Sequence, residues 1–275
     1  MIFNTNITKL LNPPPASANF NIFFQICKMH IHPHNKAGSN FKEHFVHFLM
    51  LFLAVLLGAV AENLRENHIE NNNEREYLTS LVEDLGQDTL RLNSCINSRL
   101  EKNVNAQKLI LLLGNDKIEN TKDVYYLSRL MTKVETFEGV DGTFNQLQYS
   151  GGFKVIRHKK IIKKINDYLF IRKNIYSLNK TEEEILIQFR IATSKVVNSS
   201  LFSKMLDVEK NKQYKYYIKP LDKDEPLFSY NKTDINNLIY WTSSENGNQT
   251  SNMNQMKILK MEAIDLINLI TSANK

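Results

Sequence analysis

The sequence predicts an all-α protein, with an N-terminal transmembrane helix followed by a long-helix bundle or coiled-coil-like domain. Three observations predict this class. Residues 45–61 read FVHFLMLFLAVLLGAVA and carry no charge. The chain has only 9 Gly and 6 Pro among 275 residues, which favours long helices over many short strands. Beyond residue 61, apolar side chains recur at spacings typical of an amphipathic helix.

The apolar segment is close to the minimum length for a membrane span, because its 17 residues of helix cover about 26 Å of a hydrocarbon core about 30 Å thick. His47 is its one polar residue, and the absence of a polar face argues against a buried core helix. Two membrane interpretations are left. The segment is a retained anchor, or it is the apolar region of a signal peptide with a small-residue cleavage pattern ending at Ala61. Helix formers continue from Glu62 without Gly or Pro as far as Gly86, which favours retention.

Basic residues near the segment predict its orientation. Lys28, Lys36 and Lys42 precede it, whereas Arg65 and Arg75 follow it. Because positive charge near a span stays on the cytoplasmic side, this small excess favours a cytoplasmic N-terminus and an exported C-terminal domain.

The chain therefore divides into an N-terminal tail (1–44), an anchor (45–61) and a helical domain (62–275) with a loop near 210–229. Residues 1–28 contain three consecutive prolines and no helical period, so the expected native start is Met29. Those residues are a disordered cytoplasmic tail, or they are translated from upstream sequence that is not normally made. Cys27 and Cys95 lie on opposite sides of the anchor, which argues against an intrachain disulfide.

The first helix of the domain is expected over residues 62–113, with Gly114 as its stop signal. A second helix is expected over 122–137, before Gly139 and Gly142, and a short helical turn over 143–149. The apolar stripe predicted for the first helix consists of Leu78, Leu81, Leu85, Leu92, Ile96, Leu100 and Val104.

The next helix is expected over residues 154–178. The pattern from Thr181 to Glu184 is typical of a capping box that restarts or continues this helix to about residue 206. It also explains the acidic run Glu182, Glu183 and Glu184, because helix N-termini favour carboxylates. A loop over 210–229, with an extended piece at 214–218, precedes two last helices at 234–243 and 251–273.

Two of these helices carry opposite charge. Residues 62–101 contain 4 Lys/Arg and 9 Asp/Glu, a net charge of −5, whereas residues 154–173 contain 8 Lys/Arg and 1 Asp, a net charge of +7. We predict that they pack against each other, with apolar stripes supplying most of the stability and charges the choice of pairing. The overall charge of +6 is therefore weak evidence for a nucleic-acid partner.

Four stretches fit a known pattern when taken together. They are FLMLFLAV (48–55), AENLRE (61–66), EREYLTSLVEDL (74–85) and TFNQLQYSGGFKVI (143–156), and a His-rich stretch from Met29 precedes them. Over roughly residues 29–178 the chain resembles a family of uncharacterised bacterial single-pass membrane proteins. The resemblance implies a bacterial membrane protein, and we expect the inner membrane with a periplasmic C-terminal domain. It implies no reaction and no functional residues.

Two groups of residues are candidate sites. His30, His32 and His34 would lie on one side of an extended segment, where imidazoles suit a divalent metal, but no carboxylate or cysteine completes the set. The alternative is a solvated polar tip. The candidate phosphate or anion site is basic, and it consists of Lys154, Arg157, Lys160, Lys163 and Lys164. It lacks interleaved aromatic residues, which favours a solvated helix face and makes nucleic acid an unexpected partner.

The sequence contains no G-x-S-x-G, H-E-x-x-H, P-loop or G-x-G-x-x-G pattern, so it assigns no catalytic residue and no cofactor, and an enzyme is not expected. The expected function is a membrane-anchored helical interaction or scaffold module, with a protein partner or a second copy of the chain. The alternative is an extracytoplasmic domain that senses a small ligand. A pocket lined by convergent polar groups would favour sensing, whereas a bare apolar groove would favour partner binding.

Overall fold

The structure, a computed structural model, describes residues 41–208 and 216–273. It divides into two compact units, residues 1–63 and 64–275, and each is considered by itself. The metal candidates His30, His32 and His34, the expected start Met29 and most of the tail lie outside the described residues.

In the first unit, the described residues form the beginning of helix α2 (Phe41–Leu113). This part of α2 contains the apolar segment, and α2 is long and apolar enough to cross a membrane by length and composition. None of its apolar window is buried, unlike the core helix of a soluble protein. Leu51, Val55 and Leu57, for example, are exposed.

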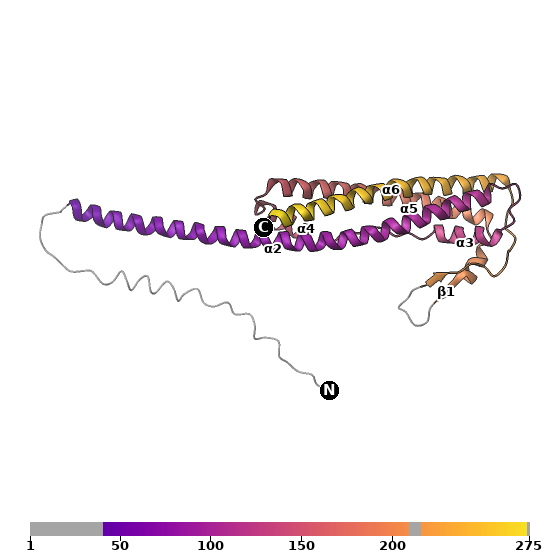
Figure 1. Cartoon of the computed structure of the whole chain (residues 1–275), viewed down its shortest axis with the longest axis horizontal. Helices are drawn as coiled ribbons and strands as arrows, with labels where there is room; N and C mark the ends of the chain where they lie inside the picture. Colours follow the sequence, from indigo (N-terminus) through magenta and orange to yellow (C-terminus); the bar gives the residue numbers. More distant parts are fainter. Residues whose placement is uncertain (1–40, 209–215, 274–275) are drawn as a thin grey trace, which may run out of the picture. The chain divides into compact units, whose positions relative to one another are not determined.

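The second unit is built on three long helices, α2 from Leu64 onward, α5 (Lys159–Val196) and α6 (Lys232–Ala273) (Figure 1). α5 runs in the same direction as α2, since Asp88 bonds to Tyr168 and, further along both helices, Arg99 bonds to Glu182. α6 runs in the opposite direction, because its residue numbers fall as those of its α2 partners rise. Lys260 donates to Asn93, and Lys102 donates to Glu245.

Shorter elements complete the bundle. Helix α3 (Thr121–Met131) starts at Asn120, whose side chain accepts a hydrogen bond from the Asp123 N–H at 3.3 Å. Residues 132–140 then return in a non-helical conformation alongside α2, where the carbonyls of Glu135 and Glu138 accept bonds from Arg99 and Arg91. Helix α4 (Gly142–Tyr149) and the 3₁₀ turn η1 (Gly152–Lys154) follow.

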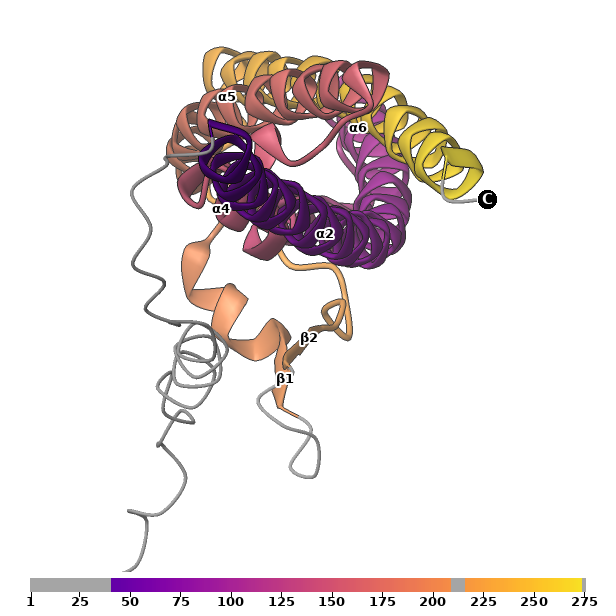
Figure 2. The ribbon, with the colours of Figure 1, turned by 90° about the vertical axis from the view of Figure 1, so that its left-hand side faces the viewer.

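The turn between α4 and η1 requires glycine. Gly151 has φ of +73°, a left-handed conformation that glycine adopts without the steric cost of a side chain. At the other end of the bundle, η2 (Ser199–Met205) leads into strands β1 (Leu206–Val208) and β2 (Tyr216–Ile218). The two strands pair antiparallel, with Leu206 opposite Ile218, and this hairpin lies to one side of the long helices (Figure 2).

Buried positions on the three long helices follow alternating spacings of three and four, the spacing of helices packed side by side in a coiled coil. On α2 the series is Leu78, Leu81, Leu85, Asp88, Leu92, Cys95, Arg99, Lys102, Ala106, Leu109 and Leu113. On α5 it is Ile161, Ile165, Tyr168, Arg172, Ile175, the half-buried Asn179, Glu182, Leu186, Phe189, Thr193 and Val196. On α6 it is Leu238, Thr242, Glu245, Gln249, Asn252, Met256, Leu259, Ala263, Leu266 and Ile270.

The apolar core is divided into two clusters. The first joins residues 78–96 of α2 to residues 161–175 of α5 and residues 253–270 of α6. The second joins residues 106–113 of α2 to α3, to the end of α5 and to the segment that contains η2, β2 and the start of α6. Between the two clusters the buried positions on α2 and α6 are polar, and α5 contributes the buried Glu182.

The predicted all-α class is confirmed, and so is the packing of the first long helix against the basic helix, because Leu85 and Ile165 share one cluster. The charges pair differently from the prediction. Arg157 does contact Glu70 on α2, at 3.6 Å. Lys164, however, pairs with Glu262 at 2.6 Å on α6.

The predicted stripe is wrong beyond Ile96. Leu100 and Val104 are exposed, and the buried positions in their place are Arg99 and Lys102. The predicted stripe departs from the buried face of α2 after Ile96, because the next buried positions on that face are charged residues.

Element boundaries also differ from the prediction. The helices predicted at 234–243 and 251–273 are one helix, α6, which continues through a polar stretch around Gly247. This stretch resembles a loop, but Glu245 and Gln249 within it are buried against α2 and α5. The helix predicted to end at residue 137 ends at Met131, and α5 starts at Lys159 and ends at Val196. The loop predicted near 210–229 lies partly outside the described residues, and its extended piece is β2.

Leu85 and Ile165 are both fully buried, so we expect Leu85→Ala or Ile165→Ala to lower the free energy of unfolding by about 2–5 kcal/mol. Reversing Lys160 and Lys163 to Glu should cost far less, because both are exposed and salt screens their interactions. Urea denaturation of the detergent-solubilised protein, followed by circular dichroism at two salt concentrations, measures both. A larger loss from the charge reversal would contradict this account of the core.

Candidate functional site

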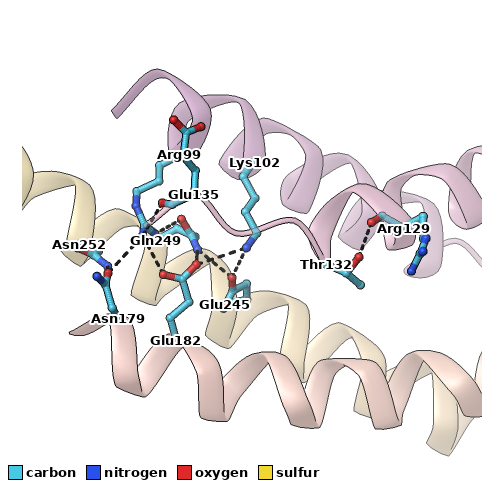
Figure 3. Close-up of polar contacts among 10 residues, drawn as sticks. All are labelled: Arg99, Lys102, Arg129, Thr132, Glu135, Asn179, Glu182, Glu245, Gln249 and Asn252. Carbon is cyan, nitrogen blue, oxygen red and sulfur yellow. Dashed lines mark hydrogen bonds and ion pairs between the residues drawn. The ribbon is translucent and has the colours of Figure 1, made fainter. Parts of the chain in front are cut away.

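A layer of polar side chains lies across the bundle between the two apolar clusters (Figure 3). We call it the central polar layer, and every long helix contributes to it. Its members are Arg99 and Lys102 from α2, Asn179 and Glu182 from α5, and Glu245, Gln249 and Asn252 from α6. All are buried except Asn179, which is half-buried.

Arg99 connects the three helices. Its Nη2 donates to Glu182 Oε2 at 2.9 Å, and its Nη1 donates to Gln249 Oε1 at 2.5 Å. Nη2 also reaches the Glu135 carbonyl at 3.4 Å and Asn179 Oδ1 at 3.5 Å. The guanidinium, which is planar and has five N–H groups, suits a position where acceptors converge from several elements.

Lys102 lies one turn further along α2 and completes the charge balance. Its Nζ donates to Glu245 Oε1 at 2.6 Å and to Glu182 Oε1 at 3.5 Å. Gln249 Nε2 donates to Glu245 Oε1 at 2.8 Å and also to Glu182 Oε1. Two cations thus face two carboxylates, and Gln249 links the two acids.

The burial of charge in the central polar layer is only partly compensated. Burial raises the pKa of Glu245 above its ordinary value, and the nearby Lys102 ammonium only partly offsets this effect. Three buried atoms of the layer, Arg99 Nε, Glu245 Oε2 and Asn252 Oδ1, have no hydrogen-bond partner. Such a layer adds little net stability compared with apolar packing, but it penalises any alignment of the helices that separates the pairs.

A second buried polar group lies closer to the α4 end of the bundle. Asp88 accepts a hydrogen bond from the Tyr168 hydroxyl at 2.5 Å and another from the Val140 N–H at 2.8 Å. Arg172 bonds to Asp141 at 2.5 Å, and its guanidinium carbon lies 5.0 Å from the centre of the Phe144 ring. These contacts attach residues 140–144 to both α2 and α5.

Burial raises the pKa of the Asp88 carboxyl, although the Tyr168 hydroxyl, the Val140 N–H and the Arg172 charge act in the opposite direction. Burial and the Asp88 charge likewise raise the pKa of Tyr168. Gly139 lies tightly against this group, since a Cβ there would come within 2.8 Å of Arg172 Nη1. A side chain at position 139 would therefore displace the arginine.

The candidate anion residues are dispersed over two elements. Lys154 is in η1, Arg157 lies in the connection between η1 and α5, and Lys160, Lys163 and Lys164 are in the first turns of α5. Arg157 and Lys164 face carboxylates of Glu70 and Glu262. Among residues 41–208 and 216–273, no group of three or more His, Cys, Asp or Glu side chains has a geometry that could hold a metal.

The structure overturns the interpretation of Glu182. The pattern from Thr181 to Glu184 does not cap a helix, because α5 is continuous from Lys159 to Val196. Glu182 has a relative exposure of 1%, while Glu183 and Glu184 are exposed. Extending the three–four series from Ile161 through α5 reaches Glu182, so the helical register is a sequence signal that could have indicated a core position.

No family model, curated protein or solved structure matches the chain. The resemblance to bacterial single-pass membrane proteins therefore stays a prediction.

We expect Glu182→Ala to lower the free energy of unfolding by about 3–5 kcal/mol. The substitution removes the carboxylate that pairs with the buried Arg99, and one of the two carboxylates that pair with Lys102. Glu183→Ala is the matched control, and a change at this exposed neighbour should stay within about 0.5 kcal/mol. Converting Arg99, Lys102, Glu182 and Glu245 together to Leu should cost less than Glu182→Ala alone. Urea denaturation measures all three variants. Equal effects at positions 182 and 183 would contradict a buried charge layer.

The raised pKa of Asp88 predicts a pH dependence of stability. As the pH falls through the folded-state pKa towards about 4, the folded protein binds a proton that the unfolded chain does not yet bind, so stability rises. Asn at this position cannot titrate. The difference in unfolding free energy between the wild type and Asp88→Asn should therefore shift in favour of the wild type between pH 7 and about pH 4.5. Glu245 titrates in both proteins and cancels, and a constant difference would refute the prediction.

Proposed function

We propose that this protein is a membrane-anchored helical interaction or scaffold module. The observation that carries the proposal is the apolar stretch of α2, which is uncharged over residues 45–61, has no buried window and precedes a helical unit in the same chain. A soluble protein rarely leaves so long an apolar surface exposed, because each apolar side chain favours leaving water. A lipid bilayer satisfies that requirement, and the segment is then a single-pass anchor.

The proposal includes a cellular location and an orientation in the membrane. Three lysines before the segment against two arginines after it support a cytoplasmic N-terminus. The resemblance described above supports a bacterial inner membrane, with the helical unit in the periplasm. The partner is a protein or another copy of this chain.

The alternative of a small-ligand sensor receives less support from the central polar layer. Polar groups do converge there, but they bond mainly to one another in the interior. A hollow beside the layer lies between α5 and the segment after α3, and it is lined by Val134, Thr136, Asn179, Lys180, Glu183, Leu186 and Arg190.

We expect the protein to fractionate with membranes and to resist extraction by alkaline carbonate. Replacing Leu53 and Leu57 by Arg should release it, because each charge near the centre of a span costs about 2.5–3.5 kcal/mol. Phe170→Arg is the matched control, since Phe170 is an exposed apolar residue of α5 that lies outside the segment. Immunoblots of membrane and soluble fractions provide the measurement.

Two outcomes would contradict the proposal. One is a wild-type product in the soluble fraction that begins at Glu62, which would identify a cleaved signal peptide. The other is an unaltered distribution of the double-arginine variant. A reporter that is active only outside the cytoplasm, fused after Lys275, tests the proposed orientation in the same cells.

A further inference from the structure

The outward face of α2 carries a second regular series of side chains, opposite the buried one. Its residues also alternate at spacings of three and four, from Leu90 to Leu111. They are Leu90, Asn93, Asn97, Leu100, Val104, Gln107 and Leu111, and all are exposed. We call this series the outer stripe.

The outer stripe is unusual for a solvated helix face because it contains no charge. Leu90 and Leu111 are 74% and 71% exposed, and Leu100 and Val104 are 44% and 51% exposed. Asn93 Oδ1 accepts a bond from Lys260 at 2.9 Å on one edge of the stripe. A helix face in contact with water does not need regularly spaced apolar residues, so the spacing of the apolar residues in the outer stripe requires an explanation.

We infer that the outer stripe pairs with the same stripe of a second copy of this chain, with the two α2 helices parallel. This inference rests on the proposed function, because copies anchored through the same part of α2 enter one membrane in the same direction. Two-fold symmetry then places each stripe residue opposite its own counterpart. Leu and Val pack on themselves, and an Asn or Gln amide bonds to an identical amide because it has both a donor and an acceptor.

The charges beside the stripe favour this pairing. In a parallel pair, residues on one edge of a stripe face residues on the opposite edge of the partner stripe. Glu101 and Lys108 lie on one edge, whereas Ile96 and Asn103 lie on the other, so no like charges meet. An antiparallel pair brings the same edges together and places Glu101 beside Glu101.

The size of the contact suits a weak complex. Two helices in contact over 22 residues bury on the order of 1,000 Å², which is near the lower limit for a specific interface. Confinement in a membrane raises the effective concentration of the second copy, so an interface of this size is sufficient. The amide pairs at Asn93, Asn97 and Gln107, which are interspersed with apolar pairs, fix the register and limit the assembly to few copies.

Disulfide crosslinking of the full-length protein in membranes tests the inference. Cys27 and Cys95 are first replaced by Ser and Ala, and Leu90→Cys or Leu111→Cys is then introduced alone. In a parallel pair each variant crosslinks to itself. Positions 90 and 111 lie about 32 Å apart along a helix, far beyond disulfide reach, so an antiparallel pair crosslinks only when both variants are present together.

Matched variants separate pairing from random collision. Lys173→Cys, at an exposed position of α5, should give at least tenfold less dimer than Leu90→Cys. Adding Leu100→Glu and Val104→Glu to the Leu111→Cys protein should reduce the dimer at least tenfold, without changing the melting temperature. Asn254→Glu, at an exposed position of α6, should leave the dimer unchanged.

Three results would overturn the inference: no self-crosslink at position 90 or 111 in membrane-bound protein, equal crosslinking at position 173, or capture of a protein of different mass. These outcomes are distinct from a failure of the proposed function, which is read from the membrane fractionation of the same samples. If the protein is found in the soluble fraction, crosslinking of that fraction at positions 90 and 111 still decides whether the stripes pair.

Discussion

The helical unit depends on the pairing of two basic and two acidic side chains in the middle of its core. Arg99, Lys102, Glu182 and Glu245 come from three helices that are far apart in sequence, and each is buried. Apolar clusters on either side supply burial energy, but apolar heptads tolerate a shift of one helix past another. A shift that separated the four charges would leave them unpaired in a medium of low dielectric constant, at a cost of several kcal/mol for each ion. The layer therefore selects one alignment of α2, α5 and α6.

The non-helical segment of residues 132–140 also takes part in the polar interactions of the core. Arg99 Nη2 donates to the carbonyl of Glu135 as well as to Glu182. Asp88 in turn takes the N–H of Val140. Residues 132–140 are non-helical where these contacts are made, because a helix would use the same backbone groups for its own hydrogen bonds. Backbone groups of this segment thereby complete the polar chemistry of the core.

Helix α2 combines three surfaces with different chemistry. Its buried series from Leu78 to Leu113 forms the core of the second unit, and its outer stripe presents uncharged side chains to solvent. Its first part is apolar on all sides. One helix thus carries the features that suit a membrane, an intramolecular core and an intermolecular contact, which is consistent with the proposed interaction module.

The sequence by itself determined the helical class, the apolar segment, the long helix of residues 62–113 and the packing of that helix against the basic helix. Those features depend on composition and local period, which are properties of neighbouring residues. Only the tertiary structure decided that Glu182 is a core residue, that the polar stretch around Gly247 is helical, and that Arg99 and Lys102 are buried instead of Leu100 and Val104. A charged residue has a low probability of burial when it is considered alone. Its burial becomes favourable only when partners as much as 150 residues away arrive at hydrogen-bond distance, as Gln249 does at Arg99, and no local pattern contains that information.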